Sequence, residues 1–110
     1  MGRGGGDVPE GARIRMTRAT KGDLIDAAVL AAHEVMRSPV GSPRVAFLFN
    51  CVGRKLVLGG RYHEEIRAAF SVLGPEIAKI GFYTYGEIAP ANGVTTYHNE
   101  TFTAVLLGVT

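Results

Sequence analysis

Three short polar clusters hold most of the side chains in this sequence that could bind a ligand or carry out chemistry. Each lies at the edge of a predicted strand, and they read Asn50-Cys51-Val52-Gly53-Arg54, Tyr83-Thr84-Tyr85-Gly86-Glu87 and Tyr97-His98-Asn99-Glu100-Thr101. A strand holds the side chains at its end rigidly. Three strand ends at one rim of a sheet could therefore form a pocket with convergent hydrogen-bond donors and acceptors.

Arg54 and Glu87 would suit the two charged groups of an amino acid. The planar guanidinium of Arg54 can clamp a carboxylate or a phosphate. Glu87 follows an apolar strand, where a partly buried carboxylate could bind an amine or act as a base. The alternative is structural: Arg54 would form a salt bridge to Glu87 or to another surface carboxylate, and Glu87 would accept backbone amides that fix the following turn.

The remaining residues of the clusters could shape the same site. Gly53 would let the backbone turn and approach a ligand or another strand closely. Tyr83 and Tyr85 share one strand face and could pack on a ligand, although two aromatic residues in a strand are also typical of cross-strand packing. His98 could orient a ligand. We therefore expect a ligand site formed by Cys51, Gly53, Arg54, Tyr83, Tyr85, Gly86, Glu87, His98 and Asn99.

Cys51 could also be a nucleophile, because a neighbouring guanidinium lowers the pKa of a thiol. An enzyme would then use His98 as base and Glu87 as orienter, and the same three residues could in principle bind a metal. A buried cysteine that packs as a small apolar side chain fits better, and the sequence has no short ligand pair such as Cys-x-x-Cys. We predict no catalytic residue, no metal and no cofactor.

Composition narrows the class of protein. The chain has 110 residues, 46% of them hydrophobic, and 12 basic against 10 acidic residues, as in ordinary globular domains. A net charge of +2 is too small to indicate nucleic-acid binding. The single cysteine excludes an internal disulfide, and no secretory pattern opens the chain, which favours the cytoplasm. The apolar runs are too short to cross a membrane.

Hydrophobic periodicity predicts an α+β fold, with two helices packed on a mixed or antiparallel sheet in the order β-α-β-α-β-β. Residues 1–8 are glycine-rich and predict a disordered lead-in or junction, and residues 9–110 predict a single domain. The predicted strands lie at 13–18, 45–49, 77–85 and 102–109, and the predicted helices lie at 22–37 and around 66–73. The strand at 45–49 is apolar on both faces, which predicts cover on two sides. Pro90 and Asn92-Gly93 indicate turns between residues 86 and 99.

The clusters, in slightly longer form, resemble the signature blocks of the FIST C-terminal domain. These blocks are Phe49-Asn50-Cys51-Val52-Gly53-Arg54, Gly81-Phe82-Tyr83-Thr84-Tyr85-Gly86-Glu87-Ile88-Ala89-Pro90 and His98-Asn99-Glu100-Thr101. The similarity extends back to Val8-Pro9-Glu10-Gly11 and the first helix, and so covers nearly the whole chain. One departure is Glu100, which stands where the family pattern has glutamine.

The resemblance implies a sensory domain of a bacterial signal-transduction protein that binds small ligands such as amino acids. Related proteins place it beside an N-terminal FIST domain and output modules. No segment here resembles that N-terminal domain, so we expect a domain fragment or a stand-alone form. Two alternatives remain open. One is an assembly domain that forms a homodimer through an exposed sheet edge or apolar face, and the other is an enzyme that uses Cys51.

Overall fold

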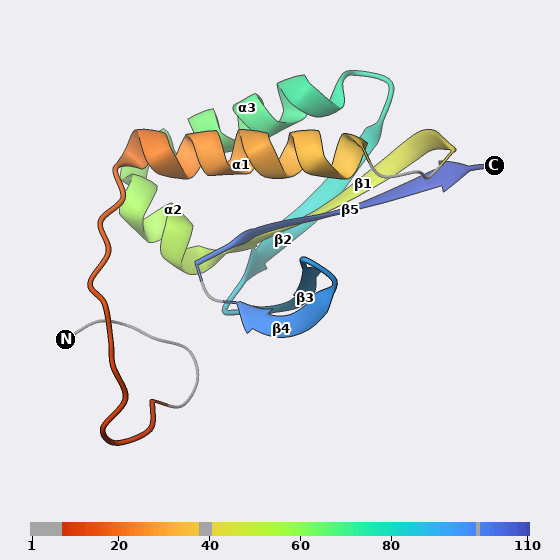
Figure 1. Cartoon of the computed structure of the whole chain (residues 1–110). Coiled ribbons are helices and arrows are strands. Elements are labelled where there is room, and N and C mark those ends of the chain that lie inside the picture. Colours follow the sequence, from red (N-terminus) through yellow and green to blue (C-terminus); the bar gives the residue numbers. More distant parts are fainter. Residues whose placement is uncertain (1–7, 38–40, 99) are drawn as a thin grey trace.

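The computed structural model describes residues 8–37, 41–98 and 100–110, and it has the predicted α+β fold. In Figure 1, the helices α1 (Lys21–Met36) and α3 (Tyr62–Leu73) lie together on one side of a sheet. Residues 1–7 of the predicted lead-in, residues 38–40 of the predicted helix break, and Asn99 lie outside the described residues.

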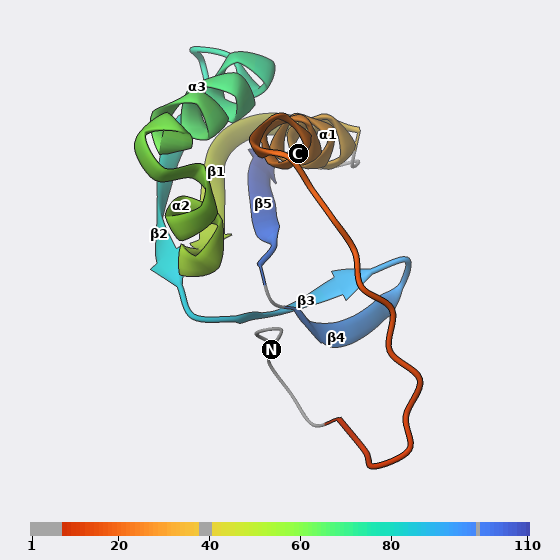
Figure 2. The same ribbon diagram turned by 90° about the vertical axis from the view of Figure 1, so that its left-hand side faces the viewer.

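The sheet has β1 (Ser42–Cys51) at its centre, with β2 (Ala78–Thr84) parallel on one side and β5 (Phe102–Val109) antiparallel on the other. Figure 2 shows these three strands side by side below α3 and α1. Alternate residues of β1, Ala46 and Leu48, point to the helices and are buried against Ala32, Ala69 and Leu106. Small side chains at the helix positions let the two layers approach closely.

Helix α1 begins with a reciprocal cap. The Thr20 hydroxyl accepts a hydrogen bond from the backbone N–H of Asp23 at 3.0 Å, and the Asp23 carboxylate accepts one from the backbone N–H of Thr20 at 2.7 Å. These bonds use amide groups that the first turn leaves without partners. The backbone bond first, and then the side-chain bond, lower the pKa of the Asp23 carboxyl.

The predicted strand at residues 13–18 is wrong. Residues 12–20 form neither strand nor helix, and Ile14 and Met16 are 77% and 85% exposed. Figure 1 shows this segment leading away from the body of the domain. An alternating pattern sets which side of a strand would be buried, but a strand also needs a partner strand, and among the described residues this segment pairs with none.

Cover on both faces of β1 is also wrong for the described residues. Phe47 and Phe49 face away from the helices and are half-buried, while their β2 neighbours Ile80 and Phe82 are 60% and 66% exposed. A fully apolar strand normally indicates two covered faces. In this domain, one of the two faces of the sheet is open.

Two stretches form elements that the sequence did not predict. Between residues 50 and 60, the short helix α2 (Val52–Leu58) and the 3₁₀ turn η1 (Gly59–Arg61) follow β1 directly. Between residues 86 and 99, β3 (Glu87–Ala91) and β4 (Val94–His98) form a hairpin. Its turn is the predicted Asn92-Gly93 pair, whose φ angles of 51° and 78° are those that a two-residue hairpin loop requires.

Candidate functional site

The three polar clusters meet at one end of the sheet. Asn50 at the end of β1 is paired with Tyr83 on β2 and with Phe102 on β5. The backbone N–H of Cys51 donates to the carbonyl of Thr101 at 3.0 Å. In the hairpin, Glu87 is paired with His98. The predicted ligand site required three strand ends at one rim of the sheet, and the clusters do meet there.

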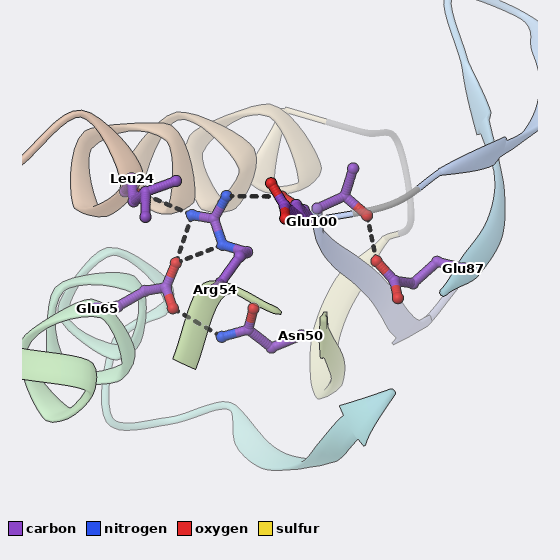
Figure 3. A network of polar contacts seen from close by, with 7 residues as sticks. Leu24, Asn50, Arg54, Glu65, Glu87 and Glu100 are labelled. Carbon is purple, nitrogen blue, oxygen red and sulfur yellow. Dashed lines mark hydrogen bonds and ion pairs between the residues drawn. The ribbon is translucent and has the colours of Figure 1, made fainter. Parts of the chain in front are cut away.

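Arg54 and Glu65 form a buried ion pair at the centre of this end. Arg54 is 4% exposed and Glu65 is fully buried. Glu65 Oε1 accepts hydrogen bonds from Arg54 Nε, at 2.7 Å, and from Arg54 Nη2. Its other oxygen accepts a bond from Asn50 Nδ2 at 2.7 Å. Figure 3 shows the guanidinium and the amide converging on this carboxylate.

The remaining donors of Arg54 bind backbone carbonyls from two other parts of the chain. Nη2 donates to the carbonyl of Leu24 in α1 at 2.6 Å, and Nη1 donates to the carbonyl of Glu100 just before β5 at 3.3 Å. One side chain thus joins α1, α2, α3 and the entry to β5 (Figure 3). Of the alternatives for Arg54, the salt bridge is present, and its partner is Glu65.

Sequence reasoning missed Glu65. The position of Glu65 in the sequence could have identified it. It lies four residues before Ala69 and eight before Leu73, and so on the buried face of α3. A carboxylate on an apolar helix face must be paired or hydrogen-bonded. This rule would have directed attention from Glu87 to Glu65 as the partner of Arg54.

Glu87 makes a second buried contact at the same end. It is 6% exposed, and its two carboxylate oxygens accept hydrogen bonds from the hydroxyls of Thr84 and Thr101. Thr84 ends β2 and Thr101 precedes β5, so Glu87 joins the start of the hairpin to the sheet. These hydroxyls take the place of the backbone amides expected for a structural Glu87.

Tyr83 lies beside the ion pair and has an ammonium group near its ring. Lys55 Nζ is 4.9 Å from the ring centroid of Tyr83 and 4.8 Å from that of Tyr62. Among the described residues, the Tyr83 hydroxyl and Asn50 Oδ1 are buried without a hydrogen-bond partner. Burial first, then the charge of Glu65 and the nearby Tyr62, raise the pKa of Tyr83 above 10.0.

This shift predicts a pH dependence. The folded protein binds the phenol proton of Tyr83 more tightly than the unfolded chain does. The contribution of this proton to the stability of the fold is therefore complete below the unfolded pKa of 10.0, and it is lost as pH rises through the higher pKa of the folded protein. In an absorbance titration, we expect Tyr83→Phe to remove a late phenolate component. Tyr85→Phe, at a 90% exposed position, should leave that component in place. Ionisation of Tyr83 at or below pH 10.0 would contradict the burial argument.

The two glycines of the predicted site allow close contacts within the protein. A Cβ on Gly53 would come within 3.1 Å of the Glu100 side chain, and one on Gly86 would come within 2.4 Å of the Tyr97 hydroxyl.

Tyr85 is exposed, beyond the end of β2. Cys51 is buried. Among the residues that the structure describes, no three His, Cys, Asp or Glu side chains are grouped to hold a metal ion.

His98 connects the strand ends to a cavity of about 500 Å³ between α1, the hairpin and β5. Its Nε2 atom lies 3.0 Å from the carbonyl oxygen of Ala89 and 3.1 Å from Thr96 Oγ1. In Figure 2, the hairpin lies below α1 on the β5 side of the sheet. The cavity is lined by Ala31, Glu34, Val35, Ala89, Pro90, Asn92, His98, Thr101, Phe102, Thr103 and Ala104.

The charge of this cavity comes from α1, a part of the chain outside the three clusters. Among the lining residues that the structure describes, Glu34 is the only Asp, Glu, Lys or Arg. Sequence reasoning missed it because nothing along the chain places residue 34 beside residue 98. The hydroxyls of Thr101 and Thr103 and the amide of Asn92 supply neutral polar groups. The cavity thus combines one acidic group with neutral donors, acceptors and apolar walls.

Comparison with known proteins gives one family. The model of the FIST C domain matches residues 3–90. This stretch contains the first two polar clusters, whereas the third, at residues 97–101, lies beyond the match. No curated protein and no solved structure matches the chain. In the described part of the chain, no helix is long and apolar enough to cross a membrane.

Proposed function

The chain belongs to the FIST C domain family, a family of sensory domains in signal-transduction proteins, and from this premise we propose that it binds a small molecule in the cavity beside His98. The position of this cavity carries the proposal. It has about 500 Å³ of space, within the range of small-molecule sites. Two of its lining residues, His98 and Thr101, also belong to the third polar cluster.

The lining favours a ligand with a primary amine. Glu34 can pair with an ammonium group, whereas a simple carboxylate would meet this negative charge with no lysine or arginine among the described lining residues. Because β5 is at the edge of its sheet, the backbone N–H and C=O groups along its unpaired edge are also available to a ligand. An amino acid would place its ammonium near Glu34 and its carboxylate toward the hydroxyl of Thr103 and the amide of Asn92.

We propose that the other predicted site residues hold the cavity in shape. Arg54 binds the carbonyl of Glu100 and Glu87 binds the hydroxyl of Thr101, so both fix the segment that leads into β5. Gly53 and Gly86 allow side chains to pack closely on the same segment and on the hairpin. Cys51, whose backbone N–H binds the carbonyl of Thr101, and Tyr83, beside the ion pair, complete this frame, which transmits a change in the cavity to the sheet.

Sensing by this route needs no chemical step. A ligand that binds one position of the hairpin more tightly than another shifts the population toward that position. We propose that the domain does this in the bacterial cytoplasm, and that neighbouring FIST and output domains respond to the hairpin.

A thermal-shift comparison of three related compounds tests the ligand class. A ligand that binds only the folded state raises the unfolding temperature by mass action. We expect leucine and its decarboxylated amine, isopentylamine, to stabilise the domain more than its deaminated acid, 4-methylpentanoate. Glu34→Gln should weaken binding of the amines by about tenfold, as expected for a lost charge-assisted hydrogen bond.

Asp26→Asn is the matched control, because it removes an exposed carboxylate from the same helix at a position outside the described lining of the cavity. It should leave the shifts unchanged. Equal stabilisation by the acid and the amine, or equal loss in the two variants, would count against a site built around Glu34.

A further inference from the structure

The sheet has an open apolar face on the side away from the helices. We use the name outer face for the apolar side chains on this side of the sheet, which come from alternate residues of its three strands. They are Phe47, Phe49, Ile80, Phe82, Val105 and Leu107. Strand pairing places Phe47 between Ile80 and Val105, and Phe49 beside Phe82. The two phenylalanine rings meet edge to face with centroids 5.3 Å apart.

The outer face is exposed over all three strands. Ile80 and Phe82 on β2 are 60% and 66% exposed, and Val105 and Leu107 on β5 are 44% and 52% exposed. Because a whole aromatic side chain presents roughly 150–250 Å², these residues with their half-buried neighbours expose on the order of 600 Å². Monomeric proteins rarely expose contiguous apolar patches above a few hundred Å². A surface of this kind is typical of an interface.

We propose that the outer face binds the outer face of a second copy of this chain. A twofold contact requires the same surface on both partners, so a charged surface would repel itself. No Asp, Glu, Lys or Arg lies among the described outer-face positions from 45 to 49, 78 to 82 and 103 to 107. The exposed area also approaches the roughly 800 Å² per partner of a standard interface.

The resulting dimer would be a six-stranded sandwich. Two sheets that pack face to face lie about 10 Å apart, with interdigitated side chains between them. The phenylalanine pair of each copy would lie against the apolar residues of the other. The helices and the ligand cavity would remain on the outside. This inference rests on the sheet and is independent of the proposed ligand.

Sedimentation velocity over a concentration series from micromolar to about 1 mM tests it. The wild-type chain is expected to form a reversible dimer. Ile80→Glu should raise the dissociation constant by at least about tenfold, because the contact would bury an unpaired charge. Leu107→Glu, on a different strand, should do the same. Ile88→Glu makes the same change on the hairpin at a 76% exposed position and should leave the dimer intact.

Circular dichroism identifies any variant that fails to fold. If one of the two outer-face variants does not fold, the variant on the other strand tests the proposal. A wild-type chain that remains monomeric up to the highest concentration would overturn the proposal. So would a dimer that survives both Ile80→Glu and Leu107→Glu, since it would use another surface such as a sheet edge. Loss of the dimer in Ile88→Glu alone would assign the contact to the hairpin and equally refute the outer face.

Discussion

Replacing Glu65 with alanine is expected to lower the free energy of unfolding by about 3–5 kcal/mol, the cost of leaving one member of a buried ion pair alone. Glu65 is fully buried and accepts bonds from Arg54 and Asn50. Without it, the guanidinium keeps two backbone carbonyls as partners but has no counter-charge. Chemical denaturation of the wild-type and variant proteins measures the difference.

The neighbouring residue provides the control. Glu64 pairs with Arg61 at 2.7 Å, but their side chains are 51% and 49% exposed. Glu64→Ala should change stability far less than Glu65→Ala, since exposed pairs contribute little. Replacing both charges, as in Arg54→Met with Glu65→Leu, should cost less than Glu65→Ala, because no buried charge is left alone. Equal effects of Glu64→Ala and Glu65→Ala would show that the ion pair does not hold the helices together.

Glu87→Ala is expected to release the hairpin from the sheet and to lower stability by about 2–3 kcal/mol, because it leaves two half-buried hydroxyls without their charged acceptor. The loss should be concentrated in β3 and β4. Hydrogen exchange of the backbone amides tests this directly, and we expect faster exchange in the hairpin than in β1.

Glu87→Gln keeps one carbonyl acceptor and should recover part of the loss. Glu76→Ala, at an exposed turn position, should leave hairpin exchange unchanged. If the hairpin exchanges at the wild-type rate in Glu87→Ala, then the contacts of Glu87 with Thr84 and Thr101 do not hold it.

Much of the fold could be predicted because its elements are encoded locally. The cap at Thr20 and the apolar spacing in α1 specify a helix without reference to the rest of the chain. The Asn92-Gly93 turn was visible for the same reason. The segment at 13–18 shows the limit, because its alternation required a sheet edge that the sequence does not identify.

The candidate site was predicted in part. Strand ends marked by polar clusters do come together, since β1 has neighbours on both sides and each contributes one cluster. What each residue binds depends on distant partners. Arg54 pairs with Glu65 because α2 and α3 both pack against α1, and Glu34 lines the cavity because α1, the hairpin and β5 surround it. Neither arrangement follows from spacing along the chain.

The most direct test of ligand binding in the cavity is a two-dimensional amide NMR titration of the full chain with isopentylamine. We predict that the largest chemical-shift changes fall in the lining segments of α1, the hairpin and the start of β5, especially around Glu34, His98 and Thr103. Such a pattern, absent in Glu34→Gln, would support a sensory domain with an amine-binding cavity. Saturable changes confined to another part of the domain, or none at millimolar amine, would contradict it.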